Sequence, residues 1–521
     1  MIFRSPYPDI EIPEVALDRF VLAQAMERRA QPALIDGSTG RTLTYGELAA
    51  GVDRVAAGLA ARGLQKGDVV GLLAPNSPEF ALAVLGALAA GGVVSPINCL
   101  ATAQDVELQL RDAVARFLVT IPPFLDRAMP AATRAGVAET FVFGEAPGAL
   151  PFAALLASEA PTPRVEIAPA DDLAALPYSS GTTGFPKGVM LTHRNLVANL
   201  LQLAGRLEMW GEERIVAVLP FFHIYGLQVV LNLGLWRGAT LVTVPKFELE
   251  PFLALLERYQ STRAFVVPPL VLALAQHPVV DRYDLSSVRS VMCAAAPLET
   301  ALEAACARRL GCEMRQGYGL TEASPATHVT SADPAKARPG TVGELVPNTE
   351  CRILDVATGR DLGPNADGEI LIRGPQVMRG YLHNPEATAA TIDADGWLHT
   401  GDLGRVDENG CFTIVDRLKE LIKYKGFQVP PAELEAVLRS HPAVADAAVI
   451  PVADVEGGEV PKGFVVLRAA VGAADLMAYV AERVASYKRI RAIEVVDAIP
   501  KSPAGKILRR VLKERHQEVP T

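Results

Sequence analysis

The most informative segment of the chain is Tyr178-Ser-Ser-Gly-Thr-Thr-Gly-Phe-Pro-Lys-Gly-Val189. An apolar run at 173–176 precedes it, and this run predicts a buried strand. After it, leucines recur with helical spacing between 196 and 203, and Thr192 is a good N-cap residue for the helix that they predict. The segment is therefore predicted to be a glycine-rich loop between a strand and a helix.

The composition of this loop is typical of a polyphosphate site. Glycines let the backbone fold closely around an anion and point its N–H groups inward, hydroxyl groups add donors, and Lys187 supplies a fixed positive charge. The alternative is a surface turn with a solvated lysine. The pattern is neither G-x-x-x-x-G-K-[ST] nor G-x-G-x-x-G, so a P-loop NTPase is disfavoured. The residues of the predicted phosphate loop are Ser179, Ser180, Gly181, Thr182, Thr183, Gly184 and Lys187.

Apolar runs without polar alternation continue from about residue 42 to 300, between helical patterns and Gly/Pro/Asn turns. Such runs are typical of strands covered on both faces, which occur in parallel sheets flanked by helices. Between about 340 and 415 the pattern changes to short strands separated by turns, which indicates a small β-rich unit. The clearest apolar runs are 69–73, 215–219, 240–244, 264–267 and 290–292.

A separate C-terminal domain is predicted from about residue 416. A charged stretch is followed by a helix that begins near Pro430, since proline is tolerated in a first helical turn. The predicted fold is therefore α/β: an N-terminal domain, 1–415, of parallel-rich α/β sheets with a small β-rich unit, and a mobile, smaller α+β domain, 416–521. The further elements expected in this domain are strands at 447–451, 463–467 and 492–496 and a helix at 474–486.

Composition and charge exclude several classes of protein. The chain has 521 residues, and 50 Lys+Arg against 59 Asp+Glu give a net charge of −9, which argues against a general nucleic-acid-binding surface. The six cysteines form no C-x-x-C pair and the eight histidines no cluster, so we expect reduced thiols and no zinc site. The longest apolar stretch, 80–96, is shorter than the ~20 residues of a membrane span. The N-terminus lacks a signal-peptide pattern, so a cytoplasmic location is expected.

With these motifs in place, the sequence resembles the adenylate-forming superfamily of acyl-CoA synthetases, adenylation domains and luciferases. Four further segments match the motifs of that superfamily in the expected order, across nearly the whole chain. Within the superfamily, Phe222-His-Ile-Tyr225 and Lys423-Tyr-Lys-Gly-Phe-Gln428 are most similar to bacterial relatives of 4-coumarate:CoA ligase. The four segments are Gln316-Gly-Tyr-Gly-Leu-Thr-Glu322, Gly396-Trp-Leu-His-Thr-Gly-Asp402, the stretch 416–428 that begins Asp-Arg-Leu-Lys-Glu, and Pro500-Lys-Ser-Pro-Ala-Gly-Lys506.

The resemblance implies an ATP-dependent acid:CoA ligase that uses ATP, Mg²⁺ and coenzyme A. Such enzymes join a carboxylate to the α-phosphate of ATP, release pyrophosphate, and then transfer the acyl group from AMP to a thiol. Because the carboxylate and the triphosphate are both anions, the first step needs charge neutralisation and alignment more than it needs a base.

The implied acids are cinnamate and 4-coumarate, with a medium-chain fatty acid as the alternative within the class. An adenylation partner of a carrier protein and a non-enzymatic nucleotide-binding scaffold are less favoured. The expected partners are small molecules, without nucleic acid or membrane, and the chain is expected to be a monomer or a homodimer.

The resemblance also implies a role for single residues. Lys506 would bridge the carboxylate and the α-phosphate, and Glu322 would hold Mg²⁺, which prefers carboxylate and phosphate oxygens. Tyr318 would lie against adenine, and Asp402, with Arg417 nearby, would bind the ribose hydroxyls. Each of these residues has a structural alternative as a solvated charge, a turn residue or a partly buried aromatic. The other implied nucleotide contacts are Ala295, Ala296, Pro297, Gln316, Gly317, Gly319 and Thr321.

The second step is implied to use a hairpin of the C-terminal domain. Lys425 and Gly426 would meet the pantetheine arm of CoA, with Lys423 and Gln428 toward the nucleotide and the site of thioester formation. A solvated charged hairpin is the alternative. Because Lys506 lies on the same domain but serves the first step, a rotation about a hinge near 416–419 is expected.

The acid is expected to lie against residues that follow Phe222. His223 is implied to belong to the catalytic set, and an aromatic wall that includes Ile224 and Tyr225 suits a planar ring, with the Tyr225 hydroxyl available to a para-hydroxyl group. A core aromatic turn is the alternative. Val229 stands where plant enzymes often have serine, so a strong preference for 4-hydroxylated acids is not expected. The other residues of the predicted pocket are Ala294, which replaces the family's usual glycine, and Gly319, Pro325 and Ala326.

Overall fold

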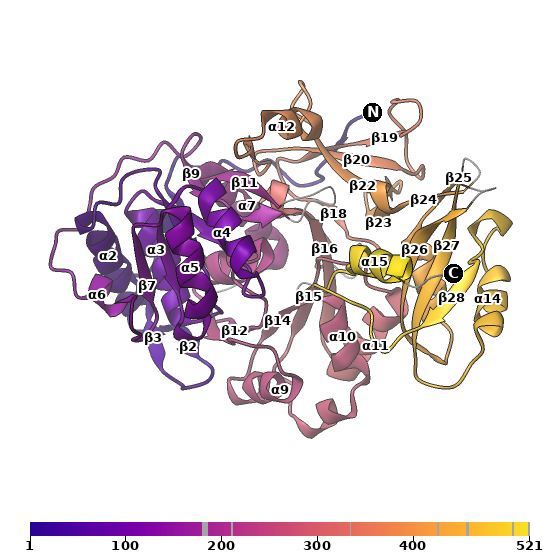
Figure 1. Cartoon of the computed structure of the whole chain (residues 1–521), viewed down its shortest axis with the longest axis horizontal. Helices are drawn as coiled ribbons and strands as arrows, with labels where there is room; N and C mark the ends of the chain where they lie inside the picture. The colour runs from indigo at the N-terminus through magenta and orange to yellow at the C-terminus, as the bar shows by residue number, and fades with distance from the viewer. Residues whose placement is uncertain are drawn as a thin grey trace.

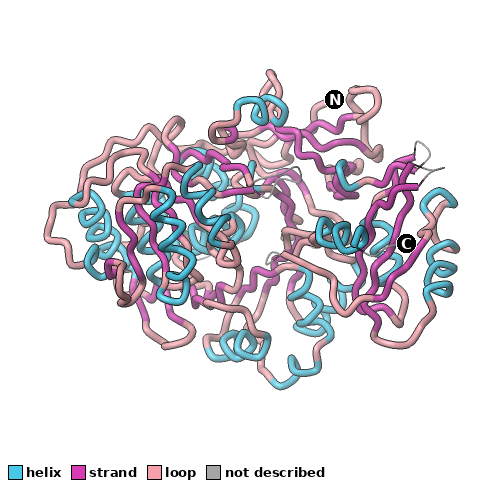
Figure 2. The backbone as a smooth tube through the Cα atoms, in the orientation of Figure 1, coloured by secondary structure: helices cyan, strands magenta, loops and turns pink. Residues whose placement is uncertain are grey.

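A computed structural model describes residues 1–179, 186–209, 212–333, 335–424, 427–454, 458–502 and 505–518. Within these ranges the chain forms four β-sheets with helices packed around them (Figures 1 and 2). Two large sheets hold mostly parallel strands, a third sheet is antiparallel, and a fourth belongs to the C-terminal part. The predicted α/β fold class, with a small β-rich unit and a smaller α+β part, is confirmed.

The first sheet has nine strands in the order β10-β11-β9-β5-β4-β6-β7-β8, with β21 paired to β11. The strands from β5 to β8 are parallel, and β11 is antiparallel to its three neighbours. Its members are β4 (Val69–Leu72), β5 (Val93–Pro96), β6 (Ala115–Thr120), β7 (Glu139–Val142), β8 (Leu150–Pro151), β9 (Leu173–Ala175), β10 (Tyr178–Ser179), β11 (Lys187–Thr192) and β21 (Gly380–Tyr381).

One strand of this sheet was not expected from the sequence. The glycine-rich segment does not lead directly into a helix, because β11 lies between them. Val189 and Leu191 are fully buried, and this buried face keeps the chain extended in the sheet. Helix α7 (His193–Leu207) follows, and the hydroxyl of Thr192 accepts a hydrogen bond from the backbone N–H of Asn195. Thr192 is therefore the N-cap of this helix, as predicted.

The second sheet has the order β18-β17-β16-β15-β14-β12-β13-β2-β3. Its central strands are parallel and buried, because they carry the apolar runs near 215, 240, 264 and 290. Its members are β2 (Pro32–Asp36), β3 (Thr42–Thr44), β12 (Arg214–Ala217), β13 (Thr240–Thr243), β14 (Arg263–Val266), β15 (Ser290–Cys293), β16 (Glu313–Gly319), β17 (Ala326–Val329) and β18 (Glu344–Leu345).

Helix α3 (Pro78–Ala89) lies between the first two sheets. It contacts β4 and β5 of the first sheet and β2 of the second, and it packs lengthwise on α2 (Tyr45–Ala61). Because α3 is buried nearly all round, its sequence is apolar on every face. The apolar stretch 80–96 is therefore a buried helix that runs into β5, as predicted.

The third sheet, with the order β1-β19-β20-β22-β23, is the predicted β-rich unit. The fourth sheet joins β24, β25, β26, β27 and β28 and packs its own two apolar clusters, formed by residues between 422 and 512. The third sheet ends at Arg417 and the fourth begins at Ile422. The strands are β1 (Phe3–Arg4), β19 (Glu350–Leu354), β20 (Gly368–Arg373), β22 (Leu398–Val406), β23 (Phe412–Arg417), β24 (Ile422–Tyr424), β25 (Phe427–Val429), β26 (Val444–Asp454), β27 (Gly458–Leu467) and β28 (Ala492–Val495).

The helices of the C-terminal part begin where predicted, but one ends early. Helix α13 (Pro431–Arg439) starts with its proline in the first turn. Helix α14 (Ala473–Ala481) ends before the predicted 486, because the N–H of Arg483 bonds to the carbonyl of Val480 and tightens the chain into a turn. The other helices are α1 (Leu17–Val21), α4 (Ala103–Asp112), α5 (Leu125–Ala135), α6 (Ala153–Leu156), α8 (Leu233–Trp236), α9 (Leu249–Arg258), α10 (Pro268–Gln276), α11 (Thr300–Leu310), α12 (Pro385–Thr391) and α15 (Arg509–Glu518).

A membrane crossing needs a helix that is both long and apolar. The helices within the described ranges include none that meets both requirements.

Candidate active site

Several of the predicted site residues that the structure describes lie where the parallel strands of the second sheet end. The segment 294–297 follows β15, Tyr318 lies at the end of β16, and residues 223–225 follow β12. Ligands commonly bind beyond the carboxyl ends of parallel strands, because side chains of successive connections meet there. The C-terminal segment also reaches this edge: Gly505 lies so close to the start of α10 that a Cβ on it would be 2.9 Å from Pro269 (Figure 1).

Tyr318, Asp402 and Arg417 form one connected group. The Tyr318 hydroxyl donates to Oδ2 of Asp402 at 2.6 Å, and Nε of Arg417 lies 3.2 Å from Oδ1. Asp402 and Arg417 are directly opposite each other on β22 and β23, so the sheet register fixes the pair. Burial raises the pKa of Asp402, and the Arg417 guanidinium and the Tyr318 hydroxyl oppose that shift. Burial and the nearby Asp402 raise the pKa of Tyr318, which keeps it a neutral donor.

Lys506 lies at the end of a short turn that its own backbone fixes. The N–H of Lys506 donates to Oγ of Ser502, and the N–H of Ser502 donates to the carbonyl of Lys506 at 2.8 Å. The pKa of Lys506 is lowered to about 8, chiefly by burial and also by Arg417 and Lys419, while Asp402 and Glu322 oppose the shift. Like charges that depress one another's pKa mark a site short of negative charge. An anion placed among them would relieve that repulsion.

The ends of the predicted phosphate loop lie side by side, because Ser179 and Lys187 are cross-strand partners in β10 and β11. The Lys187 ammonium lies 4.8 Å from the centre of the Tyr381 ring. The Tyr381 hydroxyl donates to Oε1 of Glu322 at 2.9 Å, and Thr321 begins the turn that carries Glu322. Among the predicted residues, those outside the described ranges are Ser180, Gly181, Thr182, Thr183, Gly184, Lys425 and Gly426.

Two glycines at the end of β16 permit close backbone approach. A Cβ on Gly319 would lie 2.0 Å from the carbonyl oxygen of Pro325, and a Cβ on Gly317 would lie 2.5 Å from Cε of Met292. Ala295 nearby has a φ of 75°, a conformation that non-glycine residues rarely adopt. The predicted segment 294–297 is half-buried to exposed, so its backbone groups can be reached by a ligand.

Gln316 has a partner that sequence reasoning missed. Its Nε2 donates 2.8 Å to Oε2 of Glu303 on α11, and its backbone N–H donates to Thr330. Glu303 comes from a helix outside every motif, and no local pattern marks it. Burial raises the pKa of Glu303. The pair fixes the side chain of Gln316 at the start of the Gln316–Glu322 segment.

The predicted acid pocket begins at the strand-to-helix turn after β12, as expected. Ile224, Tyr225 and Val229 are buried, and residues 225–232 form a π-helix, a wide turn that often occurs at functional sites. The Tyr225 hydroxyl donates to the backbone carbonyl of Met292 at 3.2 Å, so its proton is already used. His223 keeps a partly exposed edge, yet its ring is deeply desolvated, and this lowers its pKa to about 4.

The far side of the pocket comes from the turn between β16 and β17. Gly319 and Ala326 are cross-strand partners, and Pro325 precedes Ala326. The backbone N–H of Ala294 donates to the carbonyl of Val266 at 3.3 Å, which ties the residue after β15 to β14. The structure therefore brings the predicted pocket residues to one edge of the second sheet.

The predicted hairpin of the second step lies elsewhere. Lys423 is exposed, its backbone N–H donates to Oε2 of Glu459, and it is the cross-strand partner of Gln428. Strands β24 and β25 lie along the upper edge of the C-terminal unit, apart from β16 (Figure 1). The structure thus brings Lys506 to the candidate site and leaves Lys423 away from it.

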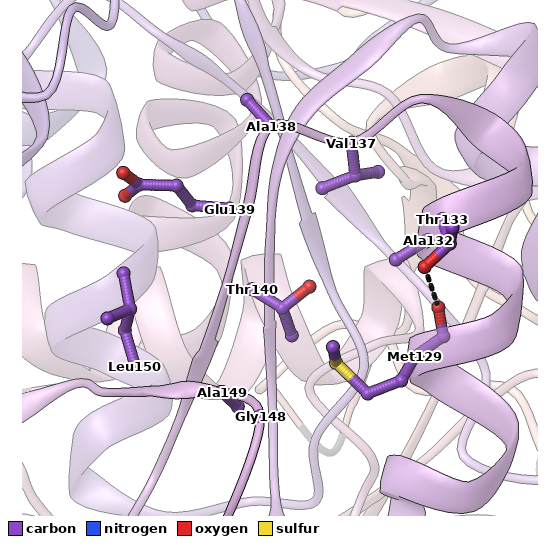
Figure 3. A pocket seen from close by; sticks show the side chains of 10 residues that line it. All are labelled: Met129, Ala132, Thr133, Val137, Ala138, Glu139, Thr140, Gly148, Ala149 and Leu150. Atoms are coloured by element: carbon purple, nitrogen blue, oxygen red, sulfur yellow. Dashed lines mark hydrogen bonds between the residues drawn. The ribbon is translucent and has the colours of Figure 1, made fainter.

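A pocket of about 500 Å³ lies apart from these residues, between α5 and the edge formed by β7 and β8 (Figure 3). It is lined by small and apolar side chains such as Met129 and Val137. Its charged residue, Glu139, is paired with Arg62 at 2.9 Å. The pocket therefore offers no cationic group for an anion.

Comparison with known proteins gives consistent results over the full length. The family profile described as "AMP-binding enzyme" matches residues 21–382, and "AMP-binding enzyme C-terminal domain" matches residues 433–506. The chain is 44% identical to "4-coumarate--CoA ligase 2" of Petroselinum crispum and 46% identical to "4-coumarate--CoA ligase 5" of Oryza sativa subsp. japonica, covering 99% of this chain and 97% of each relative.

Similar solved structures include an anthranilate CoA ligase, AuaEII, in complex with anthranoyl-AMP, with a TM-score of 0.90 and 28% identity over 97% of this chain and 98% of that one. ATP-bound MatB from Rhodopseudomonas palustris gives a TM-score of 0.88 and 30% identity over 97% and 99%.

Proposed function

The chain belongs to the AMP-binding enzyme family, and we propose that it is an ATP-dependent acid:CoA ligase for cinnamate- and 4-coumarate-type acids. It forms an acyl-adenylate with release of pyrophosphate and then the CoA thioester with release of AMP. The observation that carries this proposal is the convergence of the Lys506 ammonium on the group formed by Tyr318, Asp402 and Arg417.

Adenylation brings two anions together, and the cations of the site suit that task. Arg417 and Lys419 lie close enough to Lys506 to lower its pKa, so all three cations gain when negative charge binds among them. Lys506 would bridge the acid carboxylate and the α-phosphate. No group in this step has to remove a proton, because the acid reacts as its carboxylate.

Nucleotide binding is assigned to residues from all three N-terminal sheets. Tyr318 and Asp402 would receive adenine and the ribose hydroxyls, with Arg417 beside them. The hydrogen bond between Tyr318 and Asp402 holds both at one place, and each Asp402 oxygen keeps a lone pair for a further donor. The nucleotide would also meet the other predicted contacts, with the phosphates at the glycine-rich loop: Ser179, Ser180, Gly181, Thr182, Thr183, Gly184, Lys187, Ala295, Ala296, Pro297, Gln316, Gly317, Gly319 and Thr321.

The residues present fit a Mg²⁺ ion that arrives with ATP. Oε1 of Glu322 accepts from Tyr381, and within the described residues its Oε2 has no hydrogen-bond donor, so it can face a cation. No cluster of three or more potential metal ligands occurs among the described residues, and Mg²⁺ bound to nucleotides commonly uses one or two carboxylates plus phosphate oxygens and water. When bound, the ion neutralises phosphate charge. Glu322 orients it.

Thioester formation is assigned to the hairpin that includes Lys423, Lys425, Gly426 and Gln428. Because Lys423 is exposed while Lys506 is half-buried near Asp402, the C-terminal domain, 416–521, would rotate on the N-terminal domain, 1–415, between the steps. Residues 416–419, between β23 and β24, are the proposed hinge.

The acid pocket supports aromatic acids with weak discrimination of the ring hydroxyl. Ile224, Val229 and the ring of Tyr225 present apolar surface, and the Tyr225 proton is held by the carbonyl of Met292. A para-hydroxyl group can therefore donate to the Tyr225 oxygen but gains no strong donor there. Nδ1 of His223 accepts the backbone N–H of Tyr225, so the neutral ring carries its proton on Nε2 and would donate one hydrogen bond near the acid carboxylate. The relatives are named for 4-coumarate, which disfavours a medium-chain fatty acid.

The test is pyrophosphate exchange into ATP with cinnamate, 4-coumarate and octanoate, followed by CoA-dependent AMP release. We expect exchange with both aryl acids, with kcat/KM values within about tenfold of each other, and weak exchange with octanoate. If none of the acids supports pyrophosphate exchange, the proposal is overturned. If octanoate is preferred, the proposed substrate changes to a medium-chain fatty acid. A cytoplasmic location and a monomeric or homodimeric state remain predictions from the sequence, and light scattering measures the latter.

A further inference from the structure

Tyr381 lies between two groups of the candidate site but belongs to none of the motifs that predicted it. It is the last residue of β21, and it pairs with Val189 two residues along β11 from Lys187. The next residue, Leu382, donates its N–H to the carbonyl of Gly188, and the N–H of Tyr381 donates to Oγ1 of Thr388. The backbone of Tyr381 is thus held from both sides, and its side chain is buried.

The side chain of Tyr381 contacts an anion and a cation. Its hydroxyl donates to Oε1 of Glu322 at 2.9 Å, and the Lys187 ammonium lies 4.8 Å from its ring centre. The same segment also fixes the backbone of Glu322, whose carbonyl accepts the N–H of Met378. One residue therefore sets the positions of two groups that come from different sheets.

The neutral ring also keeps these two opposite charges apart. A lysine that met Glu322 directly would form an ion pair, and each would then be less available to a ligand. Within the described residues no such pair forms; Lys187 instead lies over an aromatic face, which attracts a cation without neutralising it. The hydroxyl occupies one oxygen of Glu322 and leaves the other to face a ligand.

We propose that Tyr381 is a positioning residue that separates the Lys187 ammonium from the Glu322 carboxylate and holds both toward the phosphates and Mg²⁺ of ATP. This inference rests on the proposed function, in which Lys187 contacts phosphate and Glu322 contacts Mg²⁺. A tyrosine that only filled the core would stabilise the fold and leave the Mg²⁺ dependence of ATP binding unchanged.

The test is calorimetric titration of the full chain with ATP, in excess Mg²⁺ and in EDTA. Tyr381→Phe keeps the ring and removes the hydroxyl, so ATP affinity in EDTA should stay within about twofold, while the gain from Mg²⁺ falls about fivefold to tenfold. Tyr381→Leu removes the ring as well, so affinity in EDTA should also fall about threefold to tenfold. When Glu322→Gln is combined with Tyr381→Phe, the gain of ATP affinity from Mg²⁺ should fall little further, because both changes act on the carboxylate oxygens of Glu322.

Tyr7 provides the matched control. Its hydroxyl bonds to Glu344 and Arg206 stacks over its ring at 3.7 Å, so it has the same two kinds of contact with residues outside the predicted site, although there the arginine and the glutamate also pair directly at 3.2 Å. Tyr7→Phe and Tyr7→Leu should lower the melting temperature without changing either titration. If folded Tyr381→Phe gains as much ATP affinity from Mg²⁺ as the wild type, this inference is overturned and the proposed function is not. Wild-type protein that binds ATP without any Mg²⁺ gain would overturn the metal assignment of the proposed function as well.

Discussion

Two lysines of the C-terminal part occupy opposite environments. Lys506 lies in a turn packed against the start of α10, and burial together with neighbouring cations depresses its pKa. Lys423 is exposed, and its backbone bonds within its own unit, to Glu459. On the proposed assignment of Lys506 to adenylation and Lys423 to thioester formation, a single orientation of this unit serves one lysine at a time. A two-step reaction that needs both must therefore move the unit.

The largest effect is expected for Lys506→Ala. Removing the ammonium leaves the carboxylate and the α-phosphate without their shared cation, so pyrophosphate exchange should fall about 10²- to 10³-fold. Thioester formation from supplied acyl-adenylate should stay within about threefold, because the turn faces the site only in the first orientation. Equal loss of both half-reactions would contradict the assignment of one lysine to one step.

The reverse pattern is expected for Lys423→Ala. Pyrophosphate exchange should stay within about twofold, because Lys423 is exposed and its strand, β24, stands apart from β16 (Figure 1). CoA-dependent release of AMP from supplied acyl-adenylate should fall about 10- to 100-fold, a size typical of lost alignment at a reacting centre. Single-turnover assays with purified acyl-adenylate measure this step directly. A fall in exchange instead would place Lys423 in the first step.

The pH profile of adenylation sharpens the same contrast. Because burial lowers the pKa of Lys506 to about 8, the free enzyme loses this ammonium as the pH rises through 8. The kcat/KM for ATP in pyrophosphate exchange should then fall by up to about tenfold per pH unit. Bound ATP adds negative charge and favours the protonated lysine, so kcat should fall only at higher pH. Lys506→Arg, which stays charged, should show no such fall near pH 8; an identical fall would exclude Lys506 as its cause.

How far the sequence could predict this molecule depends on the range of the contacts. Unbroken apolar runs such as 264–267 predict buried parallel strands, because both faces of such a strand must be covered. The motif residues were found because each motif is a local pattern, and the fold brings Tyr318 and Asp402 into contact. Glu303 and Tyr381 could not be found, because each acts on a partner 13 and 59 residues away through a contact that no local pattern encodes.

Other features depend on states that a sequence does not specify. The Tyr225 hydroxyl donates to a backbone carbonyl, and this contact cannot be predicted from sequence because every residue has such a carbonyl. The position of Lys423 depends on how the C-terminal unit is turned, and the same sequence must allow more than one orientation if both steps occur. Contacts between the C-terminal unit and the N-terminal part therefore help to set the orientation of the unit, and one of these contacts is an ion pair.

The smallest effect is expected at that ion pair, which joins the C-terminal unit to the N-terminal part. Nε of Arg439, at the end of α13, lies 2.6 Å from Oε1 of Glu299, which precedes α11. Rotation of the unit would break this contact. Arg439→Ala should therefore disfavour the first orientation, lowering pyrophosphate exchange about twofold to fivefold, the size expected for a partly exposed pair, without slowing thioester formation.

The charge reversal at this pair provides the control. Glu299→Arg should lower exchange at least as much as Arg439→Ala, since two like charges then face each other across the interface. Adding Arg439→Glu should restore exchange toward the wild-type rate, because the pair is re-formed with its signs swapped. Rates that fall additively in the double variant, or a parallel fall in thioester formation, would show that these side chains stabilise the fold and do not bias the orientation that brings Lys506 to Asp402.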